Sequence, residues 1–156
     1  MPKLAADTVL TRHESGVCGS SSVQSLGDAG ALTQFGVNLK TLAPGARSSI
    51  KHWHLNSDEL IYVLAGEVTL HEGDRIETLQ EGDVATFKAG VAAGHCLENR
   101  TDAPCSFLEI GTRAPTDTVT YPDDDRILTV EAEGQRFTWT TLDGAPASNL
   151  YSDDPA

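Results

Sequence analysis

The residues best suited to chemistry lie close together in the sequence. A single tryptophan separates His52 from His54, four residues separate His54 from Glu59, and His95 follows farther along the chain. Neutral imidazole and carboxylate suit zinc, iron, nickel or manganese, and a set of three nitrogens and one oxygen leaves positions open for water or substrate. The pattern therefore predicts one divalent transition metal bound by His52, His54, Glu59 and His95.

Strand geometry shows how these four side chains could meet. Alternate side chains of a β-strand point to the same face, so His52 and His54 share a face while Trp53 takes the other. Glu59 and His95 each begin another segment in which alternate positions are apolar. We expect all four to enter an apolar interior, where imidazoles and a carboxylate are costly unless a cation satisfies them.

The elements that would position them are short β-segments divided by Gly and Asp turns. The predicted strands cover residues 33–42, 48–55, 59–64, 67–71, 75–79, 84–87, 95–99 and 106–110. This spacing is typical of an all-β sandwich or barrel. No long stretch shows the periodicity of an amphipathic helix.

The chain length of 156 residues fits one domain. We expect a barrel core at about 33–113. Residues 1–32, rich in Ser, Gly and Asp, are interpreted as an irregular N-terminal arm with a short edge strand near 8–12. Residues 114–156 form a polar C-terminal extension, in which 126–130 and 135–142 could add strands.

Composition excludes several classes of function. The formal net charge of −12 disfavours nucleic acid and anionic membrane surfaces as partners. No apolar run is long enough to span a bilayer, and the N-terminus lacks the apolar region of a secretory signal. Three cysteines without a C-x-x-C pair favour a reducing compartment, so we expect a cytoplasmic protein.

The glycines around the ligands make the sequence resemble the cupin superfamily. The first cupin motif is matched by Gly45, His52, His54, Glu59 and Gly66. The second motif is matched by Gly82, Gly90, His95 and Asn99, with a longer loop before the histidine than the motif usually has. The resemblance covers residues 33–113, and the chain looks like the small single-domain bacterial cupins, some of which are called sugar-phosphate isomerases.

The resemblance implies a double-stranded β-helix, or jelly roll, with a metal near one end of the barrel and His95 as the fourth ligand. It also implies a homodimer in which an N-terminal strand, around residues 33–42 or in the arm before it, crosses between subunits.

Three functions remain open at this point. The first is a metal-dependent enzyme, isomerase-like or dioxygenase-like, acting on a small oxygen-rich or anionic molecule that Arg47 and Lys88 would bind at the barrel mouth. The second is a non-catalytic module that binds or senses a small ligand, favoured by an apolar lining without an evident acid or base. The third is a metal-free barrel, which the spacing of the ligands argues against.

Overall fold

The computed structural model describes residues 3–131 and 136–152. Apart from a 3-10 turn at Ala6–Thr8 and a single helical turn, α1 (Leu26–Ala29), the regular elements of these residues are strands. They are β1 (Thr11–Glu14), β2 (Ser21–Ser25), β3 (Phe35–Leu42), β4 (Trp53–His54), β5 (Glu59–Ala65), β6 (Glu67–Glu72), β7 (Arg75–Gln80), β8 (Val84–Phe87), β9 (His95–Glu98), β10 (Cys105–Thr112), β11 (Asp117–Tyr121), β12 (Arg126–Glu131) and β13 (Arg136–Thr140).

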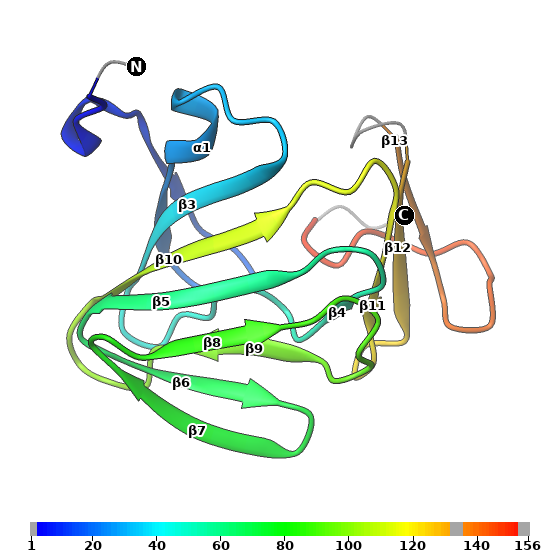
Figure 1. Cartoon of the computed structure of the whole chain (residues 1–156). Coiled ribbons are helices and arrows are strands. Elements are labelled where there is room, and N and C mark those ends of the chain that lie inside the picture. The colour runs from blue at the N-terminus through cyan, green and yellow to red at the C-terminus, as the bar shows by residue number, and fades with distance from the viewer. Residues whose placement is uncertain (1–2, 132–135, 153–156) are drawn as a thin grey trace.

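The strands form two facing layers (Figure 1). One layer is an antiparallel sheet in the order β1-β2-β3-β10-β5-β8. The other combines β7-β6-β9 with β13-β12-β11-β4. Backbone bridges from Arg47 to Glu98 and from His52 to His95 join these two parts. The expected all-β jelly roll is confirmed.

Period-two alternation places the core between the layers. In β5, Ile61 and Val63 are buried, whereas Tyr62 and Leu64 on the opposite face are 40% and 39% exposed. The largest fully buried apolar side chains come from both layers: Leu42, Val63, Val68 and Phe107. Apolar burial between the layers holds the strands in the register that positions the candidate ligands.

Two strands were not predicted. β2 pairs with β3 along its length although only Val23 of its five residues is a large apolar residue. β11 alternates buried Asp117, Val119 and Tyr121, and an acidic first residue hid this pattern. The prediction for residues 48–55 was too long, because only Trp53–His54 form regular strand there. The predicted segment 135–142 corresponds to β13, although residue 135 lies outside the described residues.

Gly66 lies at the tight turn between β5 and β6. Its φ of +78° is in the region that favours glycine, and a Cβ there would lie 3.1 Å from the carbonyl oxygen of Pro104. Gly66, the last residue of the first motif, is therefore required by backbone geometry and close packing.

Two further observations concern the composition. Cys18, Cys96 and Cys105 are free thiols. Within the described ranges, no helix has the length and hydropathy needed to cross a membrane.

Candidate metal centre

The segment that carries His52 and His54 lies between two strands of the second layer. The backbones of His52 and His95 exchange two hydrogen bonds, of 3.1 and 2.8 Å. One residue further on, β4 pairs with β11, with His54 opposite Val119. These pairings fix the backbone on both sides, and the two imidazole rings lie 4.9 Å apart between their centroids.

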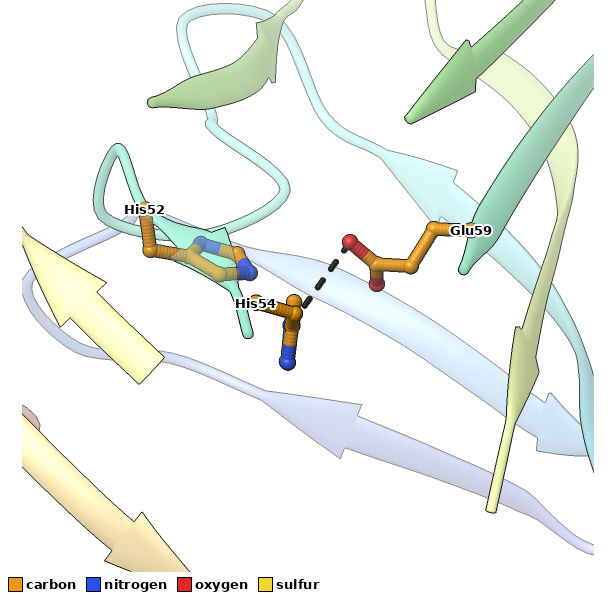
Figure 2. Close-up of side chains that lie close together, drawn as sticks. All are labelled: His52, His54 and Glu59. Atoms are coloured by element: carbon orange, nitrogen blue, oxygen red, sulfur yellow. Dashed lines mark ion pairs between the residues drawn. The ribbon is translucent and has the colours of Figure 1, made fainter. Parts of the chain in front are cut away.

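Glu59 reaches the histidines from the opposite layer, where it begins β5. Its Oε2 atom lies 2.8 Å from Nε2 of His95 and 3.6 Å from Nε2 of His54. Figure 2 shows His52, His54 and Glu59 converging, with the contact between His54 and Glu59 dashed. One ligand atom from each of these three residues lies within 4.8 Å of the other two, which is the arrangement expected of residues that could hold a metal ion.

Hydrogen bonds at the Nδ1 atoms set the orientation of the His52 and His54 rings. Nδ1 of His52 lies 2.8 Å from the carbonyl oxygen of Ile50, and Nδ1 of His54 lies 2.7 Å from a carboxylate oxygen of Asp117. Since these partners are acceptors, Nδ1 is the donor in each ring, and in its neutral form each ring then keeps the lone pair on Nε2. A neutral imidazole with a free Nε2 is the form that binds a divalent metal, so the donor set fits such an ion.

His95 is buried and joins the cluster through Glu59. Its ring stacks on Phe87 with 3.6 Å between centroids, and its Nε2 donates the hydrogen bond to Glu59. Its Nδ1 atom is buried without a partner among the described residues. Of the four predicted ligands, the structure therefore brings three within mutual reach and holds the fourth against the shared carboxylate.

Burial and neighbouring charges shift the pKa values of two candidate ligands, His52 and Glu59. Burial, reinforced by the neighbouring His54, lowers the pKa of His52 from 6.5 to about 4, so this imidazole is neutral at pH 7. Burial opposes the ionisation of Glu59, but the hydrogen bond from His95 and the nearby imidazoles outweigh it and lower its pKa. At neutral pH, His52 thus offers a neutral nitrogen and Glu59 an anionic oxygen.

Asp117 belongs to the candidate site and was not predicted from the sequence. It begins β11 and is buried, and its Oδ2 accepts hydrogen bonds of 2.7 Å from both His54 Nδ1 and Ser57 Oγ. Its Oδ1 accepts from the backbone N–H groups of Asn56 and Thr118. Burial opposes its ionisation, but these bonds together lower its pKa, so an anchored carboxylate orients His54.

Glu109 is the second residue that was missed. It lines the same internal cavity as all four candidate ligands, a space of about 240 Å³. The remaining lining is Ser48, Ser49, Ile61, Phe87, Cys96 and Leu97. The alternation of Cys105, Phe107 and Glu109 in the sequence was a signal that this carboxyl faces inward.

The two candidate substrate-binding residues lie in different places. Lys88 is exposed and lines a small hollow beside His54, Glu59 and His95. Arg47 lies at another surface hollow, where its guanidinium is 3.6 Å from the carboxylate of Glu98. The structure brings Lys88 close to the candidate ligands and does not bring Arg47 there.

Comparisons with known proteins agree with this fold. The Cupin domain family matches residues 38–111. The chain is 41% identical to a protein of known crystal structure from Silicibacter pomeroyi, described as a sugar phosphate isomerase of the cupin superfamily. The match covers 96% of this chain and 99% of that one, with a TM-score of 0.86. The chain therefore belongs to the cupin superfamily.

Two other proteins show how widely the fold is used. A structure from Acidithiobacillus ferrooxidans, provisionally assigned as a sugar phosphate isomerase, is 26% identical over 94% of this chain and 96% of its own, with a TM-score of 0.82. Oxalate decarboxylase OxdC of Bacillus subtilis is 39% identical over 77 residues, which are 46% of this chain. The match covers only 19% of that curated relative's length.

Proposed function

We propose that this cupin binds one divalent transition metal, zinc, iron, nickel or manganese, through His52, His54, Glu59 and His95. The observation that carries the proposal is the convergence of His52, His54 and Glu59 from two facing layers, with the Nε2 atoms of both histidines left free. A surface cluster of histidines would not need hydrogen bonds that fix each tautomer. Three nitrogens and one oxygen leave coordination positions for a ligand.

The proposed activity is isomerisation of a small phosphorylated sugar or a similar oxygen-rich anion. Its support is the 41% identity, over nearly the whole chain, to a protein described as a sugar phosphate isomerase. The cavity of about 240 Å³ suits a small molecule rather than a polymer. Lys88, exposed beside the ligands, supplies a positive charge that would hold an anionic group at the mouth. A role for Arg47 stays a prediction.

The chemistry assigned to the bound metal is that of a Lewis acid, which polarises a carbonyl oxygen and stabilises the negative charge that develops on it. The residues of the chain orient the site. Asp117 holds the His54 ring, and the stacking of Phe87 on His95 shields that ligand from water. The aromatic and aliphatic lining keeps the effective dielectric low and so strengthens the electrostatic interactions within the cavity.

The test combines metal analysis with a substrate panel. Protein purified without added metal, and then loaded in turn with each of the four candidate ions, should bind about one equivalent. NMR spectra of aldose and ketose phosphates incubated with each form should show interconversion of one pair. Failure to bind any of the ions contradicts the metal site. Binding without turnover contradicts the isomerase and favours the ligand-binding module instead.

We also propose that the protein forms a homodimer through the outer face of the six-stranded sheet. The register of β3, β10, β5 and β8 brings exposed apolar side chains together on that face: Phe35, Tyr62, Leu64 and Val84. Such a face is costly in water unless another surface covers it. Analytical ultracentrifugation should give the mass of two chains, and Tyr62→Glu should give the mass of one.

A cytoplasmic location also stays a prediction.

A further inference from the structure

Glu109 is an acidic residue on the inner face of β10. Its strand neighbours of the same phase, Cys105 and Phe107, are completely buried. Across the sheet, Glu109 pairs with Ile61 of β5, two positions from the candidate ligand Glu59, and with Asn38 of β3. This register directs the Glu109 side chain into the barrel, from the same six-stranded sheet that carries Glu59.

The surface that Glu109 exposes faces the internal cavity. That cavity is also lined by His52, His54, Glu59 and His95, so a small molecule bound beside these ligands would share one space with the carboxyl. Among the described residues, the Glu109 carboxyl has no hydrogen-bond partner, unlike Glu59, which is bonded to His95. A polar group that lines a cavity and has no protein partner is available to a bound molecule.

The surroundings of Glu109 favour a proton on its carboxyl. Burial raises its pKa, and the negative charges of Glu59 and Glu14 raise it further. Lys40 and His54 act in the opposite direction, but they do not cancel the effect of burial. A carboxyl group with a raised pKa is a stronger base when ionised and holds a proton at a higher pH than an exposed glutamate.

We propose that Glu109 is the catalytic proton-transfer group of this cavity. The proposal rests on the proposed isomerase activity. It names the acid–base group that this reaction needs and that the four proposed metal ligands do not provide. Glu59 cannot take this role while it serves as a ligand.

The proton transfer conserves atoms and electrons. The ionised carboxylate of Glu109 takes a proton from the carbon next to the substrate carbonyl. The C–H electron pair forms a carbon–carbon double bond, and the carbonyl π pair moves to the oxygen. Glu109 then returns the proton to the former carbonyl carbon while the neighbouring hydroxyl loses its own proton to the oxygen through solvent. The product is the isomeric carbonyl compound, and no oxidant or reductant is used.

The direct test is Glu109→Gln, which keeps the side-chain shape and removes the titrating group. We expect kcat on the interconverted sugar phosphate to fall about 100-fold or more, with little change in KM and one metal still bound. The control is Glu77→Gln, because Glu77 is an exposed strand carboxylate paired with Arg75 away from the cavity. That variant should retain full activity. A smaller loss in Glu109→Gln, at unchanged metal content, would overturn the role.

A second measurement needs no substrate. Infrared spectra of the wild-type protein, recorded over a pH series above the ordinary glutamate pKa of about 4.3, should show the carbonyl stretch of a protonated carboxyl group. The band should be absent from Glu109→Gln, or shifted in Glu109→Asp if the first variant does not fold. If no sugar phosphate reacts, the isomerase proposal fails, and this band alone decides whether Glu109 carries a proton. Its absence from the wild-type spectra would overturn the inference.

Discussion

Two histidine–glutamate pairs in this molecule have the same separation and different surroundings. In the inner pair, Nε2 of His95 lies 2.8 Å from Oε2 of Glu59. In the outer pair, Nε2 of His71 lies 2.8 Å from Oε2 of Glu98. Both pairs involve β9, which carries His95 and Leu97 on its inner face and Glu98 on its outer face. One strand thus presents the same type of hydrogen bond to two environments.

The difference lies in what else surrounds each carboxylate. Glu98 also accepts a hydrogen bond of 2.8 Å from Arg100 and lies 3.6 Å from Arg47, so arginines neutralise it at the surface. Glu59 is instead surrounded by three imidazoles inside the barrel. A histidine–carboxylate distance alone therefore does not define a metal site. Several imidazoles around one carboxylate inside the barrel, without a guanidinium to neutralise it, favour the binding of a cation.

The strongest test of this comparison removes ligands from each pair. Replacing His52 and His54 together by Ala should abolish metal binding, since only Glu59 and His95 of the proposed set remain. His71→Ala removes a histidine with the same type of carboxylate partner and should leave about one equivalent of metal bound. Elemental analysis of both variants after dialysis measures the result. Full metal retention in the double variant would refute the assignment of the inner cluster.

The free energy of unfolding of the metal-free protein should depend on pH, because His52 is buried as a neutral imidazole. The pKa of His52 is about 4 in the folded chain against 6.5 when unperturbed, so between these values the unfolded chain binds a proton that the folded chain does not. The free energy of unfolding should therefore fall as the pH drops from 6.5 toward 4, by about 3 kcal/mol in total.

Urea denaturation across that pH range measures this slope. His52→Gln should flatten it, because the titrating group is gone. His71→Gln, which changes the outer pair, should leave the contribution of His52 in place. An equal slope in wild type and His52→Gln would show that the imidazole is not buried in its neutral form.

Asp117 allows a finer test of how the inner histidines are held. Asp117→Asn keeps the shape of the side chain but weakens its hold on His54 Nδ1, and loss of such an orienting partner costs about 10- to 100-fold in metal affinity. Glu98→Gln makes the matched change in the outer pair and should not alter metal affinity. Competition with a chromophoric chelator gives both dissociation constants. Equal affinity of Asp117→Asn and wild type would mean that other bonds orient the ring.

The sequence predicted the strands whose alternation is apolar and failed where polar residues face inward. Ile61 and Val63 revealed the phase of β5 and thereby the inward direction of Glu59. β11 was missed because its buried face begins with Asp117, whose burial depends on bonds from residues about sixty positions away. Glu109 continues the alternation of Cys105 and Phe107, but the cavity that it lines is formed by residues from several strands, which no local pattern indicates.

The position of Arg47 shows another limit of sequence analysis. A cation five residues before the H-x-H pair was expected at the barrel mouth. The isolated bridge between Arg47 and Glu98 instead holds it against the outer face of β9, a long-range backbone pairing that no local pattern indicates.

The ion pairs that Glu98 forms with Arg47 and Arg100 should contribute little to stability. The Arg47 and Arg100 side chains beside Glu98 are 50% and 51% exposed, so solvent screens their attraction to the carboxylate. We expect Arg100→Ala to lower the free energy of unfolding by about 1 kcal/mol or less, measured by urea denaturation at neutral pH. Added salt should shrink the difference between variant and wild type further, because these charges lie at the surface. A loss of several kcal/mol that salt does not change would show that the charges around Glu98 behave as a buried network. The environment of Glu98 would then not differ from that of Glu59 in the way argued above.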